Sequence, residues 1–263
     1  FRSVEVTQGT SPWVVSGTVT ANVTPSSSTD YYMSVARGLV TGQYNEMKNA
    51  VSPSMSSGSH TIWSQDSLYP WASWTTAQKL YIVSSSTSDT GQTLRLEGLD
   101  ASYNKITEDV TTNGTTAVQT TQNFLRLNRG YLIAGSTNVG TITERLVSGS
   151  GTIVGGMTTG NGRNKQGVFT VPNGYTAYIL YGDVTSFKNG QGQIDGQIDM
   201  FVRASQSSPF LNAFAAGAGN GQYRNEFNVP LPIPQHADID VRFSPSANGV
   251  IVSCNWEMIL IPN

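Results

Sequence analysis

Residues 81–146 read YIVSSSTSDTGQTLRLEGLDASYNKITEDVTTNGTTAVQTTQNFLRLNRGYLIAGSTNVGTITERL, and short β-type runs alternate with turn residues along their whole length. Within residues 93–97, leucines alternate with polar side chains, which is the period of a half-buried strand. Asn113-Gly114 is a hairpin signal, because both residues tolerate positive φ. Every second residue from 125 to 133 shares one side of a further strand, with Arg126 and Asn128 on the other. These residues predict strands joined by tight turns and no helix.

The same residues carry a family resemblance. The succession VSSS…DTG…L.L.GLD..YN…E.V..NGTTAV.T...FLR.NR.Y…GS.N.GTIT resembles a segment of structural proteins of tailed bacteriophages, especially phages of marine and cyanobacterial hosts. Upstream, Thr61-Ile62-Trp63 and Tyr69-Pro70 fit the same pattern, so the similarity covers residues 38–146. It consists of many small local agreements without one chemical signature. The resemblance implies a component of the virion, and it supplies no catalytic residues.

The composition is poor in charge. Of the 263 residues, 38% are hydrophobic and only 12% are charged, against a typical charged content of about 25%. A surface of neutral polar groups suits a protein that packs against neighbours in an assembly, and it equally suits extracellular β proteins. The net charge is −2, and Lys and Arg form no cluster of the kind that replaces counterions on nucleic acid. We therefore expect no nucleic-acid partner, and the pairs Arg126/Arg129 and Arg163/Lys165 are predicted to be solvated charges.

Cys254 is the single cysteine, so no intrachain disulfide can form, and its apolar surroundings predict a small core residue. No run approaches the roughly 18 apolar residues of a membrane span, so we expect no membrane partner. No signal peptide opens the sequence, and its first residue is Phe1, which suggests trimming or processing. These features are compatible with a virion protein assembled in the reducing cytoplasm of a host cell.

Three segments are predicted. Residues 1–76 form an N-terminal arm and an aromatic-rich segment, residues 77–147 a first β unit, and residues 148–263 a second β-sandwich unit. The Gly-rich residues 147–167 separate the two β units. The only helical pattern, a poor one, spans residues 39–50. The predicted fold class is all-β: an antiparallel, jelly-roll-like β-sandwich built as two β units with an extended N-terminal arm.

The second unit carries the strongest strand patterns. Residues 175–180 are apolar on both faces, as in a central strand of a sandwich. Residues 193–203 alternate, with Asp195 and Asp199 on the polar side. In a later strand, apolar Ile239, Val241 and Phe243 lie opposite polar Asp238, Asp240 and Arg242. In the last strand, one apolar face consists of Val250, Val252, Cys254, Trp256, Met258 and Leu260.

Four aromatic residues lie close together and are the candidate assembly or docking residues: Trp63, Tyr69, Trp71 and Trp74. Aromatic rings serve both as buried core and as binding platforms. One interpretation places these rings in a core seam between the N-terminal arm and the following sheet. The other makes them a protein-docking patch or a platform for stacking sugars.

The sequence shows no constellation for catalysis, a cofactor or a metal. Asp89-Thr90-Gly91 copies the aspartic-protease tripeptide but follows a polar loop and has no second copy, so it predicts a turn. Asp195 and Asp199 are four residues apart, roughly 13 Å along a strand, too far for a glycosidase pair, and a solvated polar face is predicted. His60, His236 and Cys254 have no metal-ligand spacing: His60 and His236 are the only histidines, and Cys254 is the only cysteine.

We therefore expect a non-enzymatic structural component of a tailed-phage virion, either a head decoration or minor capsid protein or a neck- or tail-associated protein. Its partners are expected to be copies of itself in a homo-oligomer and other virion proteins. The alternative is a carbohydrate-binding adhesin of the tail or fibre tip, whose partner is a host-surface glycan. A third hypothesis, a hydrolase acting on capsule or cell wall, requires a cluster of carboxylates that the sequence does not show.

Overall fold

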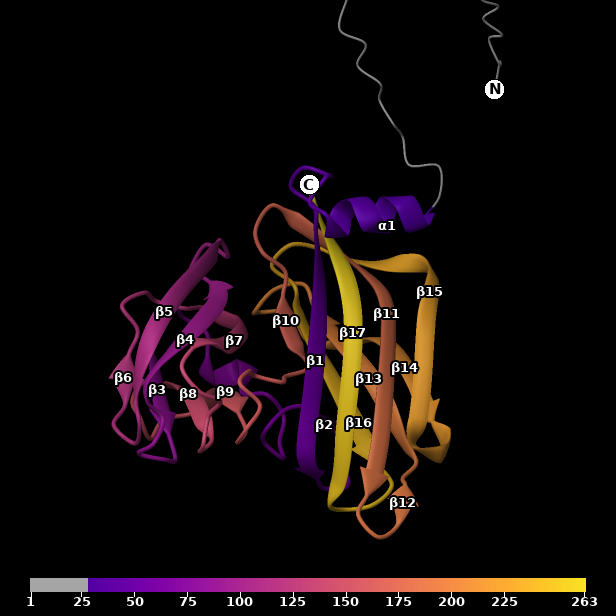
Figure 1. Ribbon diagram of the computed structural model, residues 1–263. Helices are drawn as coiled ribbons and strands as arrows, with labels where there is room; N and C mark the ends of the chain where they lie inside the picture. The colour runs from indigo at the N-terminus through magenta and orange to yellow at the C-terminus, as the bar shows by residue number, and fades with distance from the viewer. Residues whose placement is uncertain (1–27) are drawn as a thin grey trace, which may run out of the picture.

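The chain forms two antiparallel β-sandwiches, and the smaller one is inserted into the larger (Figure 1). This arrangement is seen in a computed structural model that describes residues 28–263. We call them the main sandwich and the inserted sandwich. The predicted all-β fold class with two sandwich units is confirmed. Residues 1–27 of the predicted N-terminal segment lie outside the described residues, so the arm stays a prediction.

The main sandwich has two five-stranded sheets. The first, the β1 sheet, runs β1-β17-β11-β12, with β15 also paired to β11. The second, the β16 sheet, runs β10-β16-β13-β14, with β2 also paired to β16. The strands of the β1 sheet are β1 (Tyr44–Met55), β11 (Tyr175–Lys188), β12 (Gly192–Gln193), β15 (Gln222–Ile233) and β17 (Val250–Pro262). Those of the β16 sheet are β2 (His60–Thr61), β10 (Val168–Thr170), β13 (Gly196–Arg203), β14 (Leu211–Ala218) and β16 (Asp238–Pro245).

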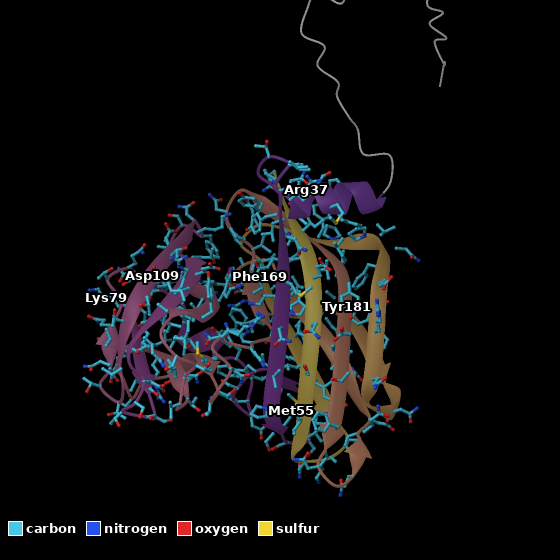
Figure 2. The ribbon with its side chains drawn as sticks, viewed as in Figure 1. Arg37, Met55, Lys79, Asp109, Phe169 and Tyr181 are labelled. Atoms are coloured by element: carbon cyan, nitrogen blue, oxygen red, sulfur yellow. The ribbon has the colours of Figure 1, made fainter. Side chains whose placement is uncertain are left out.

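The inserted sandwich has a four-stranded and a three-stranded sheet, ordered β6-β3-β8-β9 and β5-β4-β7. Figure 2 shows Lys79 and Asp109 on the side of this unit that faces away from the main sandwich. Its strands are β3 (Leu80–Ser84), β4 (Thr90–Leu99), β5 (Lys105–Asn113), β6 (Val118–Gln119), β7 (Arg126–Ala134), β8 (Ile142–Leu146) and β9 (Ile153–Met157). The remaining elements are α1 (Ser28–Ala36) and two short 3-10 turns, η1 (Trp71–Ser73) and η2 (Gly219–Gly221).

The predicted patterns of single strands are confirmed where one face meets a core. In β17, the residues predicted to share one apolar face are all buried. Burial of Cys254 raises the pKa of its thiol, because the thiolate loses its hydration. The strand predicted to be central, β11, pairs with β17 on one side and β15 on the other.

The inserted sandwich leaves and rejoins the main sandwich at one place. The chain leaves the β16 sheet after β2 and returns at β10, and both of these strands pair with β16. Gly167 N donates to Ile62 O at 2.7 Å, so the two connecting segments lie side by side. Residues between these two points therefore form a unit whose ends meet.

The predicted segment boundaries differ from this arrangement. The predicted N-terminal segment, residues 1–76, contains β1 and β2, which belong to the two sheets of the main sandwich. The helix also lies elsewhere: it ends at Ala36, and residues 44–50 of the predicted helical stretch are in β1. Pairing with β17 about 200 residues later decides the strand, and a local pattern does not contain that information.

Candidate functional site

The four candidate aromatic residues lie inside the molecule, between the inserted sandwich and the β16 sheet. Trp63, Tyr69, Trp71 and Trp74 are 2%, 4%, 6% and 0% exposed. The rings of Trp63, Tyr69 and Trp71 are in successive contact, with centroids 5.1 and 4.7 Å apart. They are therefore core residues of the junction, and their prediction as surface docking residues is corrected.

Each of these aromatic side chains also has its polar atom bonded. Trp63 Nε1 donates to a backbone carbonyl at 3.0 Å, and Trp74 Nε1 donates to Phe124 O at 3.0 Å. Tyr69 Oη donates to Val154 O at 2.8 Å. Since a buried polar group is costly when unpaired, these bonds fix the rings in one orientation. The interpretation as a core seam is the correct one, and among the described residues the partner layer is the β16 sheet.

A buried charge network joins the two sandwiches at this junction. Asp238 on β16 accepts from Arg126 of the inserted sandwich at 2.9 and 3.0 Å, and from Arg203 on β13 at 2.8 Å. Thr170 Oγ1 donates to the same carboxylate. The side chains of Arg126, Arg203 and Asp238 are 2%, 9% and 0% exposed. One carboxylate thus holds two guanidinium groups from different parts of the fold.

A second buried carboxylate lies two residues further along β16. Asp240 accepts from Thr61 Oγ1 at 2.8 Å, from Trp71 Nε1 at 3.1 Å and from Arg242 at 2.8 and 3.0 Å. Burial raises the pKa of Asp240, and the bonds from Arg242, Thr61 and Trp71 oppose that rise. The guanidinium carbons of Arg126 and Arg203 each lie 5.2 Å from the Trp71 ring centroid. The junction is therefore closed, charged and fully occupied by its own side chains.

These buried charges correct two sequence-based predictions. Arg126 was expected to be a solvated charge, and the polar side of β13 was expected to face water. Instead Arg126 is buried at the junction, and Asp199 is 4% exposed, accepting from Gln197 and Asn212 at 2.8 Å. The alternation of Asp238, Asp240 and Arg242 along β16 was the available signal, because it places charges of both signs on one face.

The remaining candidates for chemistry are held in structural bonds. Asp89 is buried and accepts from Ser84 Oγ and from the backbone of Val139 and Gly140. Burial raises the pKa of Asp89, but these hydrogen bonds outweigh it and the net shift is downward. The turn lies at Thr87 and Ser88, just before the Asp-Thr-Gly tripeptide, whose Thr90 and Gly91 begin β4. The predicted turn at the tripeptide itself is therefore corrected.

Ser56, His60 and Asp66 form an exposed cluster that resembles a triad only in composition. Asp66 accepts from the hydroxyl of Ser56 and lies 2.6 Å from His60 Nδ1. The carboxylate therefore stands between the serine and the histidine, and no imidazole contacts the hydroxyl. A nucleophilic serine needs the imidazole as its base, so this order does not activate Ser56. Among the described residues, no group of three His, Cys, Asp or Glu side chains is arranged to hold a metal ion.

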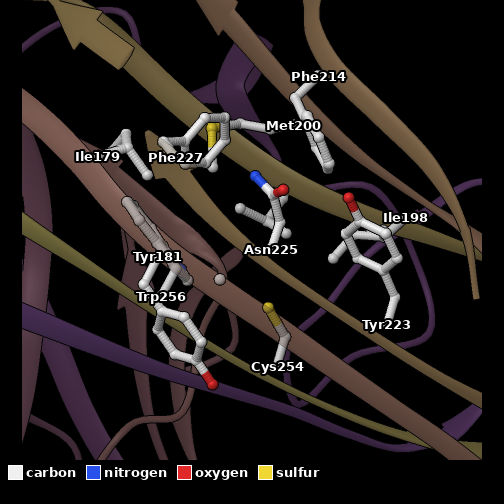
Figure 3. Close-up of a pocket in the computed structure, with 12 residues that line it drawn as sticks. Ile179, Tyr181, Ile198, Met200, Phe214, Tyr223, Asn225, Phe227, Cys254 and Trp256 are labelled. Atoms are coloured by element: carbon white, nitrogen blue, oxygen red, sulfur yellow. The ribbon is translucent and has the colours of Figure 1, made fainter. Parts of the chain in front are cut away.

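A small apolar cavity lies in the interior of the main sandwich (Figure 3). Its lining includes Ile179, Met200, Phe214 and Trp256, and its volume is about 30 Å³. That volume is the room of about one water molecule, so the cavity is too small for an organic ligand. Within residues 28–263, no helix has the length and apolar character required to cross a membrane.

No protein-family model matches the chain, and no curated protein matches it. Among solved structures, the chain is similar to one described as the crystal structure of infectious bursal disease virus VP2 subviral particle. The two are 11% identical, the TM-score is 0.23, and the alignment covers 84% of this chain and 70% of that chain. A likeness of this degree identifies neither a family nor a function.

Proposed function

We propose that this chain is a structural component of a tailed-phage particle that acts by protein–protein assembly. Its place in the particle is that of a head decoration or minor capsid protein, or of a neck- or tail-associated protein. The observation that carries the proposal is the junction, where Asp238 and Asp240 join the two sandwiches into one body. A subunit of a lattice or ring must present its contact surfaces at fixed angles, and a buried network of this kind fixes them.

The outer strands of the main sandwich support an assembled state. Leu211 on β14 and Val229 on β15 are 67% and 81% exposed, and both strands lie at sheet edges. Edge strands with exposed apolar side chains are liable to pair with other chains unless a partner covers them. The resemblance to phage structural proteins over residues 38–146 spans both β1 and most of the inserted sandwich.

The structure does not favour the alternative of a carbohydrate-binding adhesin on tryptophan platforms. Trp63, Trp71 and Trp74, on which that interpretation rested, are buried at the junction. The proposal includes no enzymatic activity, because Asp89, Asp199 and Asp66 are each engaged in structural hydrogen bonds.

The test is to locate the protein in purified phage particles. Mass spectrometry of particles freed of soluble protein is expected to detect the chain, and imaging of the particle is expected to place its two-lobed density. A copy number that follows the head lattice assigns it to the head, and a single ring of copies assigns it to the neck or tail. Absence from purified particles, with the protein remaining a monomer in solution at all concentrations, contradicts the proposal.

A further inference from the structure

A cleft of about 860 Å³ lies between the two sandwiches, along the outer edge of β1. One wall is formed by β1 and β17, through Met47, Lys48, Asn49 and Asn255, and the other by β7 and the loop before β10. This volume is within the roughly 300–1,000 Å³ of sites that bind small molecules and short segments. Unlike the buried junction, the cleft opens to solvent.

The cleft is cationic in a chain that has few charges. Its lining includes Lys48, Arg129, Arg163 and Lys165, four of the 15 Lys and Arg residues, and no Asp or Glu. Arg129 is paired with Glu46 at 2.6 Å, just outside the lining. Burial lowers the pKa of Lys48 to about 8, so Lys48 contributes less positive charge than an exposed lysine.

Uncompensated charge in the cleft comes chiefly from Arg163 and Lys165. The Arg163 side chain is exposed and forms no hydrogen bond or ion pair with any described residue. Lys165 Nζ donates to Asn161 Oδ1 at 2.7 Å and has no carboxylate partner within residues 28–263. The chain carries a net charge of −2, so this local excess of cations selects for an acidic ligand.

The backbone of β1 adds a second requirement. Val51 N donates outward, away from β17, to Lys165 O at 3.3 Å. Backbone groups of successive residues in a strand point to opposite edges, so those of Asn49 and Met47 point outward in the same direction as Val51. Apart from this bond of Val51, the outward edge of β1 has no strand partner among the described residues. An unpaired strand edge is a template for another extended polypeptide.

We propose that this cleft binds an acidic, extended segment of a partner protein, which adds as a strand to the free edge of β1. Its backbone pairs with Met47 and Asn49, and its carboxylates meet Arg163 and Lys165. Charge-assisted bonds to arginine and lysine are stronger than neutral ones, and the strand pairing fixes the register of the segment. The proposal rests on the proposed role in a particle, since it names the chemistry of the neighbour that the subunit holds.

The charge requirement is tested by fluorescence polarisation with a labelled (Glu-Thr)5 peptide on the full chain. The peptide is expected to bind, and (Gln-Thr)5 to bind at least tenfold more weakly. The double variant Arg163→Gln/Lys165→Gln is expected to lose tenfold or more in affinity. The matched control is Lys79→Gln/Lys188→Gln, which removes two cations outside the cleft and is expected to change affinity less than twofold. Equal losses in both double variants overturn the assignment to the cleft.

The backbone requirement is tested separately. Met47→Pro removes one outward N–H, at an edge position where proline is tolerated, and Met47→Ala is its control. Proline is expected to weaken peptide binding at least fivefold relative to alanine. Since Met47→Pro can also disturb folding, two (Glu-Thr)5 peptides probe the same pairing on the unaltered protein, one N-methylated at every Glu and the other at every Thr. If both bind as tightly as the unmethylated peptide, strand addition is wrong.

Competition distinguishes the peptide from an acidic sugar. Trigalacturonate is expected to compete no better than acetate at the same carboxylate concentration. If it binds the cleft and (Glu-Thr)5 does not, the ligand is a carbohydrate and the proposal is overturned. Loss of peptide binding by a protein that still enters particles rejects the site alone, whereas absence from particles rejects the proposed function and leaves the peptide result standing.

Discussion

Glu144 on β8 is a carboxyl group with no exposed surface. Burial raises its pKa to about 7 from 4.5, and the bond from Asn164 Nδ2 at 3.1 Å only partly opposes this. Because the folded-state pKa is above the unfolded one, the folded state holds more protons between pH 4.5 and 7. Unfolding free energy therefore falls as pH rises through that window, and the full penalty is present above it.

Glu144→Gln removes this penalty. The variant is expected to be more stable than the parent at pH 8 by on the order of 3 kcal/mol, and to gain nothing at pH 4. Urea denaturation of both proteins at the two pH values measures the difference. The control is Glu226→Gln, an exposed carboxyl paired with Arg224, which is expected to show no such pH-dependent gain. A gain of the same size at pH 4 and pH 8 assigns the effect to packing and contradicts the ionisation argument.

Asp238→Ala leaves Arg126 and Arg203 buried with no carboxylate between them. Removing one partner of a buried ion pair typically costs about 3–5 kcal/mol, since the remaining charge is uncompensated. We expect a loss in that range, measured by the midpoint of chemical denaturation. Arg95→Ala breaks an ion pair with Asp109 at the surface and is expected to leave the midpoint nearly unchanged. Similar losses in the two variants show that the junction is not the source of the effect.

The pairing of β4 with β7 depends on a glycine. The register shifts between Glu97 and Gly98, and a Cβ at Gly98 would lie 2.2 Å from Arg126 O. Gly98→Ala is therefore expected to destabilise by about 1–3 kcal/mol, the range for overpacking. Gly217→Ala in β14 is the matched control, because nothing lies within 4 Å of its Cβ position. Thermal melts compare the two variants. An unchanged melting temperature for Gly98→Ala would mean that β4 and β7 make room for the added methyl group without loss of stability, which contradicts the prediction.

The strands that the sequence predicts well are those whose environment is set by their own alternation. In β17, apolar residues alternate with polar ones because one face meets the core and the other meets solvent. The same logic fails for β16, whose polar face carries Asp238 and Asp240 and is covered by the inserted sandwich. A local pattern shows that a face is polar, and it does not show whether water or a charged protein layer covers it.

The candidate site was harder to predict than the fold. The grouping of Trp63, Tyr69, Trp71 and Trp74 was visible in the sequence, but their partner layer comes from β16, about 170 residues away. The cleft could not be found from the sequence, because Lys48 on β1 and Lys165 in the loop before β10 are far apart in the chain and line one cleft only in the fold. The sequence shows Arg163 and Lys165 as a pair of cations. It does not show that β1 and β17 form the opposite wall of a cleft that these two residues line.

For the molecule as a whole, the buried junction predicts one unfolding transition. The inserted sandwich shares aromatic and ionic contacts with the β16 sheet, so neither unit keeps its buried charges paired without the other. Calorimetry is expected to give a calorimetric enthalpy equal to the van't Hoff enthalpy, as for a two-state domain. Two resolved transitions, or an enthalpy ratio well above one, contradict this coupling and mean that the sandwiches unfold independently.

The insertion also sets the order in which the protein is completed during synthesis. All strands of the inserted sandwich lie within residues 80–157, whereas Tyr44 of β1 pairs with Leu260 of β17. At ~5–20 residues per second, the ribosome needs about 5–20 s to add the roughly one hundred residues from the end of β9 to the end of β17. Over that interval β1 has left the ribosome without its partner. The unpaired β1 segment carries polar residues, among them Glu46, Lys48 and Asn49. Such residues lower the tendency of an exposed strand to pair with a wrong strand.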